Sequence, residues 1–348
     1  MSSEDEDILL PDDEANAQPA TRAFAFAEMI ACEACLRANA PTRMNCLYCG
    51  AQLPVLDARH DLRRPTLRPL ETWEQGFSVV LLPLQVITQM SVDALAEASG
   101  LLRLEAAQLR TMAEAQMPLP LARTVSRDEA TLVERKLRAL GWQLEIVADA
   151  DLAVETQVPK RIRKLELGED AVTGWASAEG EAERVGWRQI ELLLLGRIAR
   201  KRIEVEERRG RRADHEIVEA REFHDDESVL DLYFNGSAVN WRIMAENFDY
   251  SCLGAGKSVL ATENFKRLVE FFRVRAQSAA FDDSYRSVRH YLKFAWPLAE
   301  QTEAGNLRRI RPGRYNSEAV TNMSNETQFT RYGRLLHYLR SRRPPHVT

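Results

Sequence analysis

Four cysteines near the N-terminus constrain this chain more than any other feature of its sequence. They form two Cys-x2-Cys pairs separated by ten residues: Cys32, Cys35, Cys46 and Cys49. Two such pairs can bring four thiolates to a tetrahedral metal ion, and zinc suits them because it accepts this geometry and has no redox chemistry. A segment of roughly 30 residues is too small for an adequate hydrophobic core, so the metal must supply the stability. The spacing predicts one structural Zn²⁺ ion, with disulfides as the disfavoured alternative.

The segment 30–53 resembles two zinc-binding families. Its second half, CLYCGAQL, matches the second knuckle of short zinc ribbons, Cys-x-x-Cys-Gly-Ala-x-Leu. The four cysteines with Asn39 also match the Ran-binding-protein type of zinc finger, some members of which bind ubiquitin or single-stranded RNA. That family normally has Trp two residues before the first Cys, where this chain has Ile30, and the change removes a stacking platform for RNA. Nearby polar residues face either solvent or a partner: Arg37, Arg43 and Asn45.

Charge and composition narrow the class of protein. Forty-seven basic and 52 acidic residues give a net charge of −5, so no global field draws the chain to nucleic acid or membrane. The head is acidic, whereas residues 305–348 hold nine arginines against two glutamates. These ends are either solvated or in contact with an anionic partner. The absence of a signal-like N-terminus or a long apolar run, together with cysteines in metal-ligand spacing, predicts a cytoplasmic protein without a membrane span.

Shifts in composition predict a multidomain α+β chain of six segments. They are a disordered acidic tail at 1–24, a zinc ribbon at 25–56, a linker at 57–72, a small α/β domain at 73–150, a β-barrel domain at 151–275 and a helical basic extension at 276–348. The tail lacks the apolar side chains needed to offset the entropy of ordering, and the linker mixes arginine with proline.

The segment 73–150 has a β-α-α-α-β pattern, with a further short strand as an option near 119–125. FSVVLL reads as a buried strand, and WQLEIV alternates as a half-exposed one. Ser126 and Glu129 form a capping-box pattern at the start of the third helix. Together with SGLLRLEAAQL and TVSRDEATLVERKLRALGWQLEIV, these features resemble the C-terminal domain of the bacterial ribosomal stalk protein over 77–148. That family recruits translation factors through a Lys- and Gly-rich helix surface. The corresponding stretch here has no Lys, so the resemblance implies the fold rather than the role.

The segment 151–275 contains several short β-rich runs separated by charged stretches such as RRGRRAD and HDDES, which we interpret as turns. This spacing favours an antiparallel barrel. A helix follows with one apolar stripe: Phe265, Leu268, Val269 and Phe272. About seven strands capped by a helix, with GWRQI entering an apolar strand, resemble the bacterial pleckstrin-homology-like family over about 155–275. Basic groups at predicted turns, such as 160–164 and 208–212, leave anionic lipid binding as an alternative.

Other motifs give weaker signals. GAGKS at 254–258 lacks the first glycine of a phosphate loop and is interpreted as a turn before the helix near Thr262. The acidic triplet at 225–227 is interpreted as a hairpin tip, the six histidines lack ligand spacing, and Cys252 has no nearby histidine. The extension at 276–348 contains two helix candidates, SYRSVRHYLKFAW and QFTRYGRLLHYLRS.

Each of these module types acts by contact rather than by chemistry, which is an analogy at the level of fold. The sequence therefore predicts a zinc-binding bacterial adaptor that binds a protein partner and is not an enzyme. The alternative is a nucleic-acid- or ribosome-associated protein that uses the zinc ribbon and the arginine-rich tail.

Overall fold

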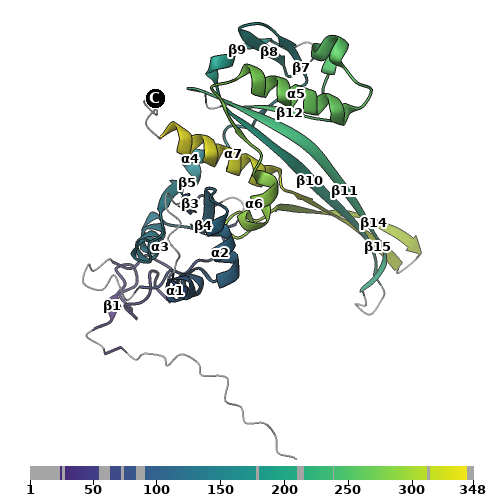
Figure 1. Cartoon of the computed structure of the whole chain (residues 1–348). Coiled ribbons are helices and arrows are strands. Elements are labelled where there is room, and N and C mark those ends of the chain that lie inside the picture. The colour runs from purple at the N-terminus through teal and green to yellow at the C-terminus, as the bar shows by residue number, and fades with distance from the viewer. Residues whose placement is uncertain are drawn as a thin grey trace, which may run out of the picture. The chain divides into compact units, whose positions relative to one another are not determined.

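The structure is a computed structural model that divides the chain into two compact units, Met1–Thr66 (unit 1) and Leu67–Thr348 (unit 2). It describes residues 24–25, 28–54, 63–71, 74–83, 91–177, 180–209, 215–237, 239–311 and 314–342 (Figure 1). All but the last residue of the predicted acidic tail lie outside these ranges, as do parts of the predicted linker. The fold is mixed α+β with several sheets.

Unit 1 has little regular structure in its described part. Strands β1 (Ile30–Ala31) and β2 (Ala38–Asn39) pair antiparallel, with Ile30 opposite Asn39. Its buried apolar cluster consists of Ile30 and Leu53 packed against Cys32 and Cys46. Such a cluster is too small to hold a fold by burial alone, which is the condition that the cysteine spacing implied.

The first part of unit 2 is a three-stranded antiparallel sheet of order β4-β3-β5 with helices around it. The elements are β3 (Phe77–Leu81), α1 (Val92–Leu102), α2 (Ala106–Glu114), β4 (Leu119–Thr124), α3 (Arg127–Ala139), β5 (Leu144–Ala148) and α4 (Asp149–Leu152). The Ser126 hydroxyl accepts from the backbone N–H of Glu129, as predicted for the start of α3. The expected β-α-α-α-β order is incomplete, because the optional strand is a full, entirely buried edge strand of the sheet.

A curled half-barrel sheet follows, with strand order β14-β15-β10-β11-β12-β6 and β13 paired to β10. Its first strands are β6 (Lys160–Ile162), β10 (Ile190–Arg209), β11 (His215–Phe234) and β12 (Trp241–Met244). A separate antiparallel sheet contains β7 (Lys164–Leu167), β8 (Ala171–Trp175) and β9 (Glu183–Gly186). Helix α5 (Ala261–Arg275) comes next, and all four residues of its predicted apolar stripe are buried.

The predicted succession of short strands is wrong for β10 and β11, which are 20 residues long each. The acidic triplet at 225–227 lies inside β11 and not at a hairpin tip. Charged residues are tolerated there because the register sets them beside cations of β10. Arg197 Nε lies 2.9 Å from Asp226 Oδ1, and Arg200 lies 3.4 Å from Asp225.

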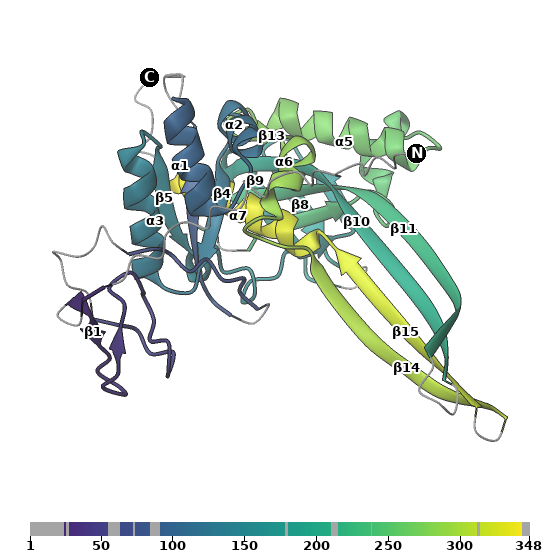
Figure 2. The ribbon, with the colours of Figure 1, turned by 90° about the horizontal axis from the view of Figure 1, so that it is seen from below.

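The prediction of a helical extension at 276–348 holds for α6 (Tyr285–Leu292) and α7 (Glu326–Ser341) but is wrong for the chain between them. The short β13 (Ala280–Asp282) precedes α6, and the chain between the two helices forms the hairpin β14 (Ala299–Arg311) and β15 (Arg314–Ser324). β15 pairs with β10 from Arg200 to Arg209. The four strands β10, β11, β14 and β15 thus continue as a long curved ribbon, here called the arm (Figures 1 and 2). The sequences of β14 and β15 are mostly polar, so no apolar alternation marked these two strands.

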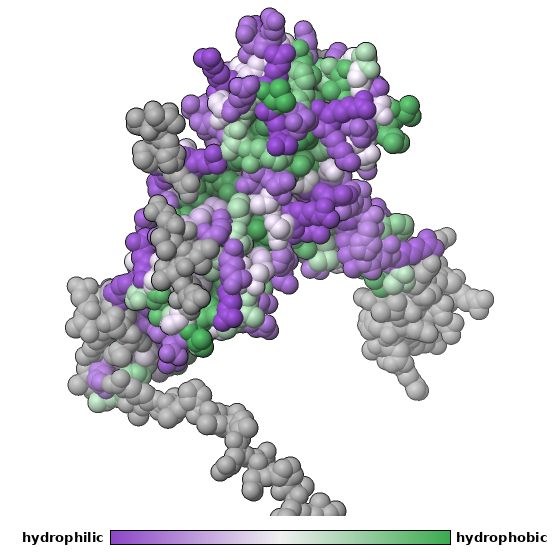
Figure 3. Space-filling view, viewed as in Figure 1, coloured by the Kyte–Doolittle hydropathy of each residue, from purple (hydrophilic) through white to green (hydrophobic). Residues whose placement is uncertain are grey.

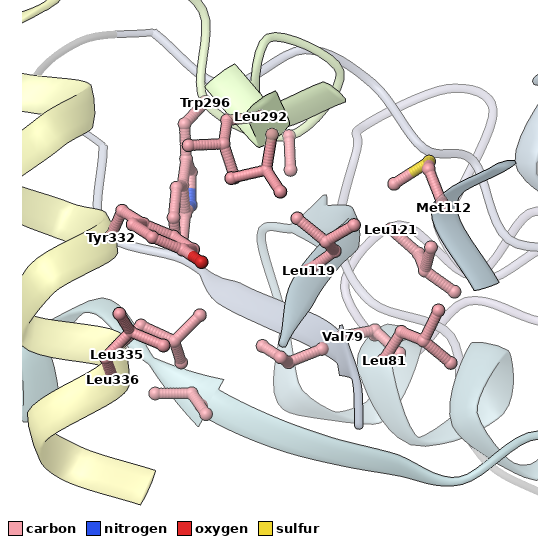
Figure 4. Close-up of a cluster of buried hydrophobic side chains, with 14 of the residues drawn as sticks. Val79, Leu81, Met112, Leu119, Leu121, Leu292, Trp296, Tyr332, Leu335 and Leu336 are labelled. Carbon is pink, nitrogen blue, oxygen red and sulfur yellow. The ribbon is translucent and has the colours of Figure 1, made fainter. Parts of the chain in front are cut away.

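Helices α6 and α7 complete the core of the first sheet. Figure 4 shows Tyr332, Leu335 and Leu336 of α7 facing Leu119 and Val79, and all of them belong to one buried cluster. Also buried there, the indole N–H of Trp296 donates to the hydroxyl of Ser78 over 3.1 Å. The segments predicted as separate, 73–150 and 276–348, therefore share one hydrophobic core.

A buried ion pair links α7 to the curled sheet. The side chains of Asp231 on β11 and Arg242 on β12 are 0% and 1% exposed, with 2.7 Å between Arg242 Nη2 and Asp231 Oδ2. Arg242 also donates to the Thr330 hydroxyl over 2.9 Å and lies 3.0 Å from Glu326. Because a buried charge is costly without full pairing, this network fixes the N-terminal half of α7 against β11 and β12.

The surface of unit 2 is mixed in character. Figure 3 shows hydrophilic and apolar side chains interspersed on one face. Large apolar residues that stand out from the surface at the ends of α5 include Val259, Leu260 and Val274. Within the described ranges, no helix has the length and apolar character needed to cross a membrane.

Candidate metal centre

The two Cys-x2-Cys segments fold into matching knuckles. In the first, the backbone N–H of Leu36 donates to the carbonyl of Cys32 over 2.7 Å; in the second, that of Gly50 donates to Cys46 over 3.0 Å. The residue after each second cysteine has a left-handed backbone, with φ of 59° at Leu36 and 74° at Gly50. Glycine adopts this conformation freely, whereas leucine is strained in it. The backbone therefore turns in the same way at both positions, but only one of them has the residue suited to the turn.

The knuckles bring all four predicted cysteines together. Their Sγ atoms lie within 4.8 Å of one another. Cys32 and Cys49 are 3.6 Å apart, and Cys35 and Cys46 are 3.5 Å apart. Four sulfurs about 2.3 Å from a tetrahedral ion would be separated by roughly 3.8 Å, whereas bonded sulfurs lie about 2.05 Å apart. The arrangement is that of a metal site, and all five cysteines of the chain are free thiols.

Asn39 forms hydrogen bonds that connect the two halves of the cysteine cluster. It is 2% exposed, and its amide donates to the Arg37 carbonyl over 2.8 Å and to Cys46 Sγ over 3.5 Å. Its Oδ1 accepts from the backbone N–H of Leu47 over 2.8 Å. One side chain therefore ties β2 to the second knuckle and orients a ligand, as outer-shell groups of metal sites do. The sequence marked Asn39 only through a family pattern and did not reveal this role.

The ligand environment stabilises negative charge on one sulfur in particular. Burial raises the pKa of Cys46, but hydrogen bonds from the backbone N–H groups of Cys49 and Tyr48 and from Asn39 outweigh it and lower that pKa to about 6. The backbone N–H of Ala51 lowers the pKa of Cys49. Burial and the other three sulfurs outweigh this hydrogen bond and raise the pKa of Cys49 to about 12. Four thiols this close cannot all ionise without a cation among them, which is the electrostatic condition for metal binding.

The structure also places the residues flanking the cysteines. Ile30, which stands where the Ran-binding-protein type has tryptophan, is 3% exposed and packs inside unit 1. The Arg37 guanidinium lies over the Tyr48 ring at 4.7 Å, and Arg43 Nε donates to the Asn45 carbonyl over 3.2 Å. These polar residues therefore have contacts within unit 1, while the ring of Tyr48 stays half exposed.

The weaker motifs of the sequence lie in unit 2. GAGKS begins inside a 3-10 turn, Tyr250–Gly256, before α5, and Gly254 supplies a positive φ of 51° there. Cys252 lies in the same turn, and burial raises the pKa of its thiol to about 11, so the thiol stays protonated at neutral pH. Among the described residues, the four cysteines of unit 1 are the one group of His, Cys, Asp and Glu side chains placed to hold a metal ion.

Comparison of the chain with protein-family models, with curated proteins and with solved structures gives no match.

Proposed function

We propose that this chain is a cytoplasmic zinc-binding adaptor in which one structural Zn²⁺ ion holds unit 1 and the protein acts by contact rather than catalysis. The observation that carries the proposal is the cluster of four Sγ atoms within 4.8 Å. Four thiolates suit zinc among common cellular metals and leave no open coordination position for a reacting water. The proposal also assigns a zinc-ribbon fold to 30–53, a stalk-like fold to 77–148 and a pleckstrin-homology-like fold to about 155–275.

Two features of unit 2 support the finer fold assignments. The sheet β4-β3-β5 with α1, α2 and α3 has the strand-and-helix content expected for the stalk-like domain. The strands β6 to β12 followed by α5 have the strand number and terminal helix expected for the barrel. Both likenesses belong to families that bind partners, which favours an adaptor over an enzyme by analogy.

The metal is tested by elemental analysis of the full-length protein. We expect one zinc per chain, retained through gel filtration and lost from Cys32→Ser and Cys46→Ser. Cys252→Ser is the matched control, because this fifth cysteine lies outside the cluster, and it should keep the full zinc content. Protein without metal, or equal zinc in all three variants, would refute the assignment. Partner capture by wild type and Cys252→Ser but not by Cys46→Ser would connect the metal to the adaptor role.

A second candidate function, nucleic-acid binding, is favoured by the register of the arm. β10 ends at Arg209, which lies opposite Tyr315 of β15, and Arg311 at the end of β14 pairs with Arg314 at the start of β15. The pairing gathers six arginines at the far end of the arm: Arg208, Arg209, Arg308, Arg309, Arg311 and Arg314. The sequence assigned these residues to a barrel turn and a tail, and it gave no sign that they meet. Arginines that the backbone register sets at neighbouring positions of an extended hairpin fit a phosphate backbone.

Salt dependence tests this second function. A gel shift at about 50 mM salt should show binding that falls steeply as salt rises. Replacing Arg308 and Arg309 by Gln should weaken it, whereas Arg340→Gln, on exposed α7 surface, should not. Absence of binding at low salt would exclude nucleic acid and leave the adaptor proposal intact.

A further inference from the structure

A small cavity of about 250 Å³ lies where α4 and the chain after it meet α7. Its walls include Asp149, Leu152, Val154, Glu155 and Arg331. All of them belong to unit 2, and none takes part in the metal centre or the arm. The cavity is smaller than the roughly 300–1,000 Å³ of drug-sized ligand sites, so its size suits a small metabolite.

Arg331 is the unusual member of this cavity. The residue as a whole is 8% exposed on α7, and within the described part of the chain its guanidinium has no hydrogen bond or ion pair. Burial lowers the pKa of Arg331, and the neighbouring charge of Arg123 lowers it further. An arginine that is largely buried without a partner is costly, and Arg242 on β12 shows how this protein pairs one when the role is structural. Arg331 therefore has the character of a binding group rather than of a packing residue.

Asp149 lines the same cavity and has an unsatisfied acceptor oxygen. Its Oδ2 accepts from Arg123 Nε over 2.9 Å, from Arg123 Nη2 over 2.5 Å and from the backbone N–H of Gly76 over 2.8 Å. Its Oδ1 is buried and has no hydrogen-bond partner. A carboxylate held so firmly through one oxygen presents the other in a fixed position, where a donor from a ligand would meet it.

Part of the cavity wall is apolar, and contacts outside the cavity hold this part in place. Leu152 and the adjacent Ala153 and Val154 form it, and Ala153 ends α4 with a left-handed φ of 47°. Arg334 of α7 holds the following turn by donating to Gln157 Oε1 over 2.9 Å. At the rim, Gln75 donates to Glu155 Oε2 over 2.9 Å. The cavity is therefore bounded by elements that the fold already holds in place.

We propose that this cavity binds a small apolar α-amino acid, with its carboxylate on Arg331, its ammonium group on Asp149 Oδ1 and its side chain against Leu152 and Val154. The planar guanidinium matches a carboxylate in bidentate geometry. Arg123 and Arg331 balance Asp149 and Glu155 in charge, so a zwitterion of zero net charge fits better than inorganic phosphate, which Asp149 would repel.

The test uses the full-length protein and three matched probes. L-leucine carries both charged groups, L-leucinamide lacks the carboxylate, and 4-methylpentanoate lacks the ammonium group. In isothermal titration and thermal unfolding, L-leucine should bind and raise Tm, and each analogue should bind at least about tenfold more weakly. No binding by wild type to L-leucine or to a panel of other apolar amino acids would overturn the proposal. Equal binding of leucine and leucinamide would overturn the role of Arg331.

Arg331→Met separates a ligand role from a structural one. Because it removes an unpaired buried charge and keeps apolar volume, it should keep or raise the Tm of the ligand-free protein while abolishing the leucine-induced rise. Arg340→Met, on the exposed side of the same helix, is the control and should bind as wild type does. A lower Tm for Arg331→Met in a protein that binds no amino acid, or binding that persists in this variant, would refute the site. The probe series on wild type decides the question if Arg331→Met does not fold.

Discussion

The two knuckles of the metal centre allow a paired test, because the same left-handed backbone position holds leucine in one knuckle and glycine in the other. Leu36 and Gly50 have φ of 59° and 74°. Leu36 is 82% exposed, and a Cβ added to Gly50 would meet nothing within 4 Å. Neither Leu36→Gly nor Gly50→Ala therefore changes packing much, and backbone conformation dominates the result.

The magnitude follows from two opposing terms. A left-handed backbone costs an L-residue about 1–2 kcal/mol, and the extra freedom of glycine in the unfolded chain offsets about 0.4–1 kcal/mol of this. The net effect is about 0.5–1 kcal/mol. For the Zn²⁺ ion proposed above, metal binding and folding are coupled in a unit of this size, so the effect appears in the apparent zinc affinity as a change of about two- to fivefold. Leu36→Gly should bind zinc more tightly than wild type, and Gly50→Ala more weakly.

The assay is competition for zinc between the full-length protein and a chromophoric chelator at fixed pH. The double variant should return close to the wild-type affinity, because the two positions are separate and their effects should add. Shifts of both single variants in the same direction, or no shift for Gly50→Ala, would show that the left-handed turns do not limit the stability of the centre.

Three further predictions concern unit 2. Gly333→Ala should lower Tm by several degrees, because the added methyl would overlap the Tyr233 hydroxyl, and overpacking costs about 1–3 kcal/mol; an unchanged Tm would contradict this packing. Asp231→Asn should cost about 3–5 kcal/mol in chemical denaturation by leaving a buried guanidinium poorly paired, whereas the same change at the exposed Asp226 should cost about 1 kcal/mol or less. Burial raises the pKa of Glu326, but the surrounding arginines outweigh burial and hold the pKa of this carboxyl below 4.5. The pKa of Glu326 is thus lower in the folded state than in the unfolded state. The stability that its ionised carboxylate contributes is complete above pH 4.5 and is lost as pH falls through the folded-state pKa. The Tm difference between wild type and Glu326→Gln should therefore shrink on going from about pH 7 to about pH 3, and a constant difference would refute it.

Local patterns predicted the parts of this structure that local physics determines. The cysteine spacing predicted the cluster, Ser126 predicted the start of α3, and the apolar stripe of α5 is buried as expected. Each of these signals lies within one short segment of chain, where ligand spacing, side-chain period and capping act directly.

The features that the sequence did not predict share one cause, which is that they depend on residues far apart in the chain. Asp225 looked like turn sequence because nothing nearby in the chain neutralises it, and its partner Arg200 is 25 residues away. The hairpin β14–β15 has no apolar alternation of its own, and the strand that pairs with it, β10, lies about a hundred residues earlier in the chain. In the metal centre, Leu36 gave no hint of a left-handed backbone, since the residue type that announces it, glycine, is present only in the other knuckle. The cavity at Arg331 joins residues 149–156 to a helix some 180 positions later, and no sequence pattern spans that interval.

The late position of α7 has a consequence for biosynthesis. β3 is among the first strands to leave the ribosome, yet its neighbours in the core include Tyr332 and Leu335 of α7. At about 5–20 residues per second, the sheet must wait for roughly ten seconds or more with one apolar face uncovered. During that interval the nascent chain is a natural client for chaperones, and ribosome stalling before residue 326 should yield a protease-sensitive product even though the sheet itself has been translated in full.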